Sequence, residues 1–187
     1  MDLIDDRDSR PSRRTTTAIG AALLLIAVLL AGAAADRWQR EREVDQLLAR
    51  AGAAQGTISY ADQRIAGTLS YVSPQIRQPS APARVRASLR AIVQEEAAGQ
   101  LSALKADRTA MAETWIIRWH DEQRTARRAY VDYLDARLGY FEAVAGDLAE
   151  LSVPRPELAA RHEAARSALA AAAGHAPVGG APGGPAG

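Results

Sequence analysis

Cysteine is absent from this chain, and lysine occurs once, at Lys105. Without cysteine there is no disulfide framework, no thiol chemistry and no sulfur to carry a lipid after the apolar segment. The cationic side chains are therefore almost all arginines, which, together with many alanines, is typical of a GC-rich bacterial genome. Basic and acidic residues nearly balance, 23 against 22, and this balance argues against nucleic acid as a partner.

Strand signals are also almost absent, because the chain has no alternating run of β-branched residues bounded by turn residues. Apolar residues instead recur every three or four positions along most of the chain after residue 36. We therefore predict an all-α protein. A single N-terminal transmembrane helix continues into an antiparallel three- or four-helix bundle, or a helical hairpin, and a disordered Gly/Pro-rich tail follows at 174–187.

An uncharged and mostly apolar stretch runs from Ala18 to Ala35, between Arg14 and Asp36. With the threonines that precede it, this stretch would make about 31 Å of helix, close to the thickness of one hydrocarbon core. We predict a retained membrane anchor at 18–35. The alternative is a signal peptide cleaved after Ala33-Ala34-Ala35, which offers a small-x-small site.

Arginines flank the apolar stretch equally on both sides, so counting positive charges does not give its orientation. A short tail before a first apolar segment usually stays inside, and long domains translocate largely regardless of charge. We therefore expect residues 1–17 to be a disordered cytoplasmic tail. Residues 36–173 then form an extracytoplasmic helical domain.

Prolines and apolar periodicity divide that domain into helices. The first is expected to run from the anchor to about Ser73, with Val44, Leu48, Ala51 and Ile58 on its apolar face and one skipped turn at Gln55. Gly52 and Gly56 weaken its middle and allow a kink. Further helices are expected from a Ser80 cap to about residue 111, from about residue 120 until Pro154 and Pro156 stop it, and at 157–173, with a connection at 112–119.

Chemical motifs are few. His162 and Glu163 begin a zinc-protease pattern, but Arg166 stands where the second histidine is required, so we expect a solvated helix face there. His120, Asp121 and Glu122 could form a general base or part of a metal site, although acidic residues are also typical of the first turn of a helix. Glu95 and Glu96 are expected on a salt-bridged surface. We predict no catalytic, metal or cofactor site.

Tryptophans suggest where the protein meets lipid. Trp38 follows the anchor between Arg37 and Arg40, as expected for an aromatic belt at the headgroups. If the first helix leads outward and the second returns, the segment from Trp115 to Trp119 comes back toward the membrane. Its alternative role is to cap the core of the bundle. The candidate residues for membrane or partner contact are Trp38, Trp115, Ile116, Ile117, Arg118 and Trp119.

These features favour a non-catalytic, single-pass interaction module of the bacterial cell envelope, whose partners are membrane lipid and other envelope proteins or itself. One alternative is an extracytoplasmic ligand-binding bundle that works with a partner protein. Its pocket would involve Arg137 among Tyr130, Tyr133 and Tyr140. Another is a secreted helical protein, if the anchor is cleaved.

Overall fold

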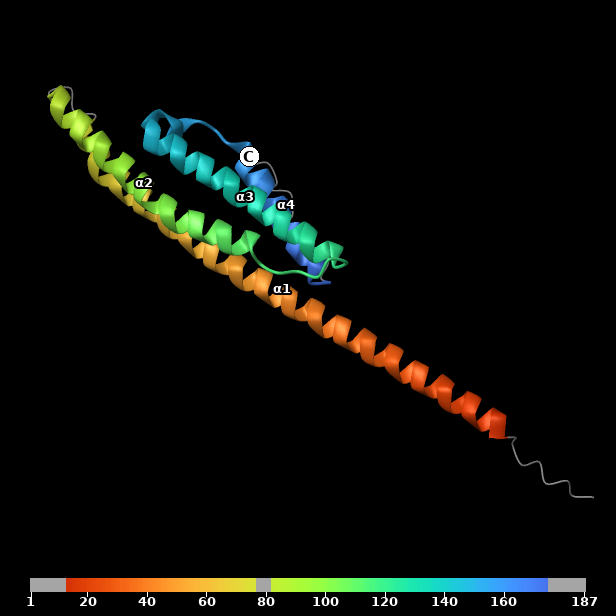
Figure 1. Ribbon diagram of the computed structural model, residues 1–187. Helices are drawn as coiled ribbons and strands as arrows, with labels where there is room; N and C mark the ends of the chain where they lie inside the picture. Colours follow the sequence, from red (N-terminus) through yellow and green to blue (C-terminus); the bar gives the residue numbers. More distant parts are fainter. Residues whose placement is uncertain (1–12, 77–81, 175–187) are drawn as a thin grey trace, which may run out of the picture. The chain divides into compact units, whose positions relative to one another are not determined.

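A computed structural model describes residues 13–76 and 82–174 of the chain (Figure 1). Their regular elements are helices: α1 (Arg13–Ile76), α2 (Ala83–Ala112), α3 (Asp121–Gly146), the 3₁₀ helix η1 (Leu148–Ser152) and α4 (Pro156–Ala172). The predicted all-α class is confirmed, and the four long helices pack antiparallel.

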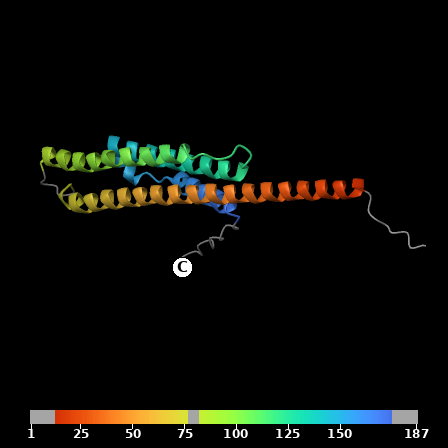
Figure 2. The same ribbon diagram turned by 60° about the horizontal axis from the view of Figure 1, so that its bottom comes forward.

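The chain divides into two compact units, residues 1–40 and residues 41–187. The described part of the first unit is a helical segment, the beginning of α1. The second unit is the bundle, and it consists of the remainder of α1 together with α2, α3, η1 and α4. Figures 1 and 2 both show α2 beside this later part of α1, and α3 beside α4.

Ion pairs and ring contacts between helices show which helices of the bundle are neighbours and in which direction each one runs. Lys105 meets Glu142 and Arg108 meets Asp135, so residue numbers rise along α2 while they fall along α3. Contacts also join α1 to α2, α1 to α3, and α3 to α4. These contacts are Arg64–Glu96 at 2.8 Å, Arg137–Asp62 at 2.6 Å, and the rings of Tyr133 and His162 at 4.9 Å.

Helix α1 contributes an unbroken seam to the core of the bundle. The buried residues alternate at spacings of three and four, which is the pattern of helices that pack at a shallow angle. They are Val44, Leu47, Ala51, Ala54, Ile58, Ala61 and Ile65. The sequence-based prediction was wrong at two points: Leu47 rather than Leu48 enters the core, and Ala54 fills the turn that was expected to be skipped.

Gly52 and Gly56 lie within α1, which continues past both to Ile76 and includes Pro74. A methyl group added to either glycine would meet nothing within 4 Å. Both residues therefore lie on a face of the helix that no neighbouring side chain covers. The seam packing, rather than local helix propensity, carries α1 through this weak region.

The boundaries of the elements differ from expectation at several places. Residues 13–17, expected in the disordered tail, are helical, whereas residues 1–12 lie outside the described part of the chain. Pro82 occupies the N-cap position of α2, and Ser80, the expected cap, lies outside the described residues.

The third helix is shorter than predicted, because α3 ends at Gly146 before either proline is reached. Asp147 has an extended backbone, and its Oδ1 accepts a hydrogen bond of 2.9 Å from the backbone N–H of Ala149. This side chain caps η1 and ends the α-helical run. The prolines come after η1 and open α4, with Pro156 in the first turn of that helix.

Helix α4 ends at Ala172, and Gly174, two residues later, has a φ of +70° and donates a backbone hydrogen bond of 2.9 Å to the carbonyl of Ala171. Glycine adopts this left-handed conformation without the steric penalty that a side chain brings. The expected disordered tail at 174–187 otherwise lies outside the described residues.

Candidate functional site

The apolar stretch at the start of α1 is exposed throughout its described length, residues 21–35. Seven large apolar side chains are 52–69% exposed: Leu23, Leu24, Leu25, Ile26, Val28, Leu29 and Leu30. The helix is long and apolar enough to cross a membrane, and none of its apolar window is buried in the structure. By length and composition the stretch fits either a membrane anchor or a signal sequence.

Trp38 lies three residues beyond this stretch and is 59% exposed. Nearby, the guanidinium of Arg40 binds the carboxylate of Asp36 at 2.8 Å, across one turn of the helix. The position of Trp38 is therefore compatible with the predicted aromatic belt.

Within the bundle, the segment that joins α2 to α3, residues 113–120, is held by a single carboxylate of α1. The backbone N–H of Ile117 donates to Oε1 of Glu43 at 2.9 Å. The second oxygen, Oε2, lies 2.6 Å from Nδ1 of His120. Glu43 and His120 are 1% and 0% exposed, so water cannot replace these contacts readily.

Two more hydrogen bonds fix the beginning of the same segment. Arg127 donates from Nη1 to the carbonyl of Thr114 at 2.8 Å, and the hydroxyl of Thr114 donates to the carbonyl of Ala110 at 3.0 Å. Thr114 itself is buried. The segment is thus tied to α1, α2 and α3, and the exposure of its tryptophans does not result from a loose loop.

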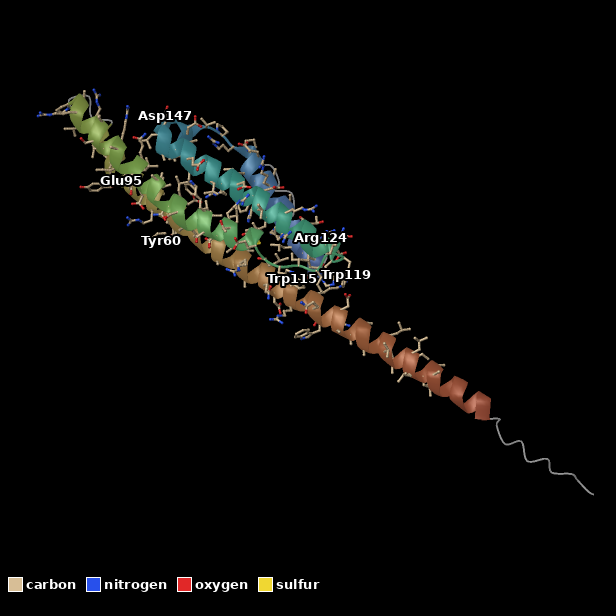
Figure 3. All side chains as sticks on the ribbon, in the orientation of Figure 1. Tyr60, Glu95, Trp115, Trp119, Arg124 and Asp147 are labelled. Atoms are coloured by element: carbon tan, nitrogen blue, oxygen red, sulfur yellow. The ribbon has the colours of Figure 1, made fainter. Side chains whose placement is uncertain are left out.

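The structure divides the five residues 115–119 into two groups. Ile116 is buried among the core residues, and Ile117 is half-buried. Trp115 and Trp119 are 65% and 67% exposed, and Arg118 is exposed between them. Figure 3 shows Trp115 and Trp119 at the same end of the bundle as Arg124, and Asp147 at the other end. Of these five residues, Trp115, Arg118 and Trp119 are therefore the most exposed.

His120 marks the start of α3, as the sequence indicated, and Asp121 and Glu122 stand in its first turn. The side chain of His120, however, makes no capping hydrogen bond and contacts Glu43 instead. Glu43 was not among the candidates identified from the sequence. It is an acidic residue directly before Val44, which was predicted to lie on the apolar face of the helix. A charged residue in that position is a signal for a buried polar partner.

The other candidates from the sequence are surface features or parts of the core. Glu163 binds Arg166 at 3.1 Å on an exposed face of α4, as predicted. Glu96 pairs with Arg64, and this hydrogen-bonded guanidinium lowers the pKa of the Glu96 carboxyl. Among the described residues, no group of three or more His, Cys, Asp and Glu could hold a metal ion.

Arg137 lies among aromatic rings, but it has other partners there. Its guanidinium binds Asp62 and stacks over Tyr140 and Phe141, at 5.5 and 5.1 Å from the ring centres. Tyr130 is buried, and its hydroxyl donates to the carbonyl of Ala51 at 2.9 Å. These contacts join α3 to α1 and give Arg137 a structural role.

Two open hollows lie on the bundle. One, of about 630 Å³, is lined by residues of α2 and η1 such as Arg90 and Leu148. The other, of about 620 Å³, lies between α1 and the end of α2, where Gln46, Arg50 and Glu113 line it beside Trp115. Neither hollow includes Arg137.

Comparisons of the chain with protein-family models, with curated proteins and with solved structures gave no match.

Proposed function

We propose that this protein is a single-pass, membrane-anchored helical module of the bacterial cell envelope, with residues 1–17 in the cytoplasm and the bundle on the extracytoplasmic side. The observation that carries the proposal is the uncovered apolar surface of residues 21–35. Soluble proteins rarely expose a contiguous apolar surface of this kind. A lipid bilayer is the environment that accommodates it, because the backbone groups in the interior of a helix are hydrogen-bonded to one another.

The energetics of insertion are favourable by a small margin. The large apolar residues of the stretch contribute about −0.3 to −0.6 kcal/mol each, whereas one arginine at its centre costs about 2.5 to 3.5 kcal/mol. Leu25→Arg should therefore move the protein out of the detergent-requiring membrane fraction. Leu48→Arg is the matched control, because Leu48 lies on the surface of the bundle and is 46% exposed. An L25R chain that still fractionates as an integral membrane protein would contradict the anchor.

Cleavage and orientation need separate measurements. A retained anchor leaves the N-terminal sequence ahead of Ala18 in the mature protein, whereas cleavage would make Asp36 its first residue. A reporter enzyme that is active only outside the cytoplasm, fused after Gly187, should be active. A mature chain that begins at Asp36 and needs no detergent would identify a secreted protein instead.

The role of the bundle is interaction rather than catalysis. Its exposed large apolar side chains include Leu48, Tyr60 and Tyr71 on α1 and Ile92 on α2. Because the chain lacks cysteine, a single Tyr71→Cys or Tyr60→Cys variant can carry a photo-crosslinker at one defined position. We expect these variants to capture specific envelope proteins, or a second copy of the chain, in native membranes. A Thr125→Cys variant on α3 is the control, and equal patterns from all three variants would contradict a specific surface.

A further inference from the structure

We propose that Trp119, Arg118 and Trp115 form a second membrane contact, which rests on the headgroup layer of the same bilayer that holds the anchor. This inference depends on the proposed function, since it requires residues 18–35 to be inserted. It adds a lipid-binding surface on the bundle itself. The site is the segment between α2 and α3, more than 75 residues after the anchor in the sequence.

Chain length keeps this segment close to the membrane. Glu43, which binds the backbone of Ile117 and the ring of His120, follows the last residue of the apolar stretch by eight positions. Eight residues span about 12 Å as α-helix and at most about 28 Å when fully extended. The headgroup layer adds about 5 to 7 Å outside the hydrocarbon on each side. A modest tilt of the anchor, about 20° on average for such helices, brings the segment within reach.

The chemistry of the exposed side chains fits that layer. Tryptophan is enriched where hydrocarbon meets water, because its ring is apolar and its indole N–H still finds a polar partner. Trp115 and Trp119 are each about two-thirds exposed on a segment that four hydrogen bonds hold in place. A fixed segment loses little conformational freedom when its tryptophans enter the headgroups.

The surrounding charges indicate that attraction to anionic lipid is not the driving force. Arg118 makes no ion pair within the described part of the chain, but Asp121 and Glu122 are exposed beside it, and Arg124 is bound to Asp121. Residues 118–124 therefore carry two arginines and two carboxylates, whose charges balance. The contact should form on zwitterionic lipid, unlike that of a polybasic segment.

The two tryptophans should reach different depths. Trp119 precedes His120, and the centres of their two nearly perpendicular rings lie 6.1 Å apart, next to Glu43. Trp115 lines the hollow beside Gln46 and Arg50, which come later along α1 and so farther from the anchor along the chain. The expected order of lipid contact is Trp38 first, Trp119 second and Trp115 third.

The test uses the full-length chain reconstituted in phosphatidylcholine vesicles that carry a quencher on the lipid headgroup. Three variants each keep one tryptophan and replace the other two with phenylalanine. The control replaces all three and adds Tyr71→Trp, a site that is 71% exposed near the other end of α1. We expect a several-fold greater loss of fluorescence for Trp119 than for the control, with Trp115 between them.

The result separates this proposal from the anchor itself. If the chain inserts but the segment stays in water, Trp38 is quenched while Trp119 behaves like the Tyr71→Trp control, and the second contact is disproved. If the chain does not insert, Trp38 is not quenched and the protein does not float with the vesicles, so the proposed function fails. Quenching of Trp119 only in vesicles with anionic lipid would overturn the neutral-surface mechanism.

Discussion

The carboxylate of Glu43 and the imidazole of His120 meet at 2.6 Å in the interior of the bundle, although 77 positions separate the two residues in the chain. Glu43 uses its other oxygen to hold the backbone of Ile117. One acidic side chain of α1 thus fixes both the start of α3 and the segment that precedes it.

Removal of the Glu43 carboxylate should destabilise the bundle strongly. Glu43→Ala removes the buried carboxylate that contacts Nδ1 of His120 and accepts from the N–H of Ile117, and breaking a buried pair typically costs about 3 to 5 kcal/mol. Urea unfolding followed by circular dichroism measures the loss. Glu96→Ala is the control, because its pair with Arg64 lies at the surface, where ion pairs contribute little. Similar losses for the two variants would show that the Glu43 pair is not a structural clamp.

The adjacent leucines 47 and 48 test the register of α1. Leu47 is fully buried and Leu48 is 46% exposed. Leu47→Ala should therefore cost about 2 to 5 kcal/mol through lost burial and the cavity left behind, while Leu48→Ala should change the stability of the bundle little. The same unfolding measurement compares them. A larger effect at Leu48 would mean that α1 is rotated from the arrangement described above.

The error at these leucines shows where prediction from sequence stops. The helical period and the prolines were sufficient to predict the all-α class and the approximate positions of the helices, because these signals are local. Leu47 and Leu48 both fit the three- and four-residue spacings between Val44 and Ala51, so the hydrophobic pattern does not separate them. The buried Ala54, which follows Ala51 in the seam, has a small side chain that carries little weight in such a pattern.

The candidate site was predictable only in part, for a different reason. The exposed tryptophans and the apolar stretch are visible as composition. The partner of His120 is not, since it belongs to another helix and the contact exists only once α1 and α3 are side by side. Similarly, the end of α3 depends on the backbone of Asp147 and its hydrogen bond to Ala149, whereas the prolines farther along were the stronger sequence signal.

We expect the stability of the bundle to decline at alkaline pH because of Tyr130. Burial raises the pKa of its hydroxyl to about 12, from an ordinary value of 10.0. The unfolded chain therefore loses this proton first as the pH rises, so the stabilising contribution is complete below pH 10 and declines from there toward about pH 12. Absorbance of ionised tyrosine and unfolding, followed together against pH, should show Tyr130 titrating as the helices are lost.

Tyr130→Phe is the matched variant for that titration. It removes the hydrogen bond to Ala51, which should cost about 1 kcal/mol near neutral pH, and it should make the alkaline decline shallower. The decline should not vanish, because burial also raises the pKa of Tyr133 and of Tyr140. An unchanged alkaline profile in Y130F would mean that Tyr130 is not the group responsible.

Gly52 and Gly56 should be replaceable by alanine with a gain in stability. Both lie inside α1, and an added methyl group would meet nothing within 4 Å. Alanine restricts the unfolded chain and favours the helix, by about 0.5 to 1 kcal/mol for each residue. Gly174→Ala provides the opposite case, since the φ of +70° there should make alanine unfavourable by about 1 kcal/mol.

The same glycine variants also report whether another protein chain packs on this face of α1, beyond the predicted anchor. The gain for Gly52→Ala and Gly56→Ala follows from an open face, so it should be seen in purified, detergent-solubilised monomer. If another chain packs closely against these glycines, the added methyl groups would weaken that association, because a residue without a side chain allows another chain to approach the backbone closely. Crosslinking yield in native membranes, compared between the double variant and the unaltered chain, distinguishes an open face from a covered one.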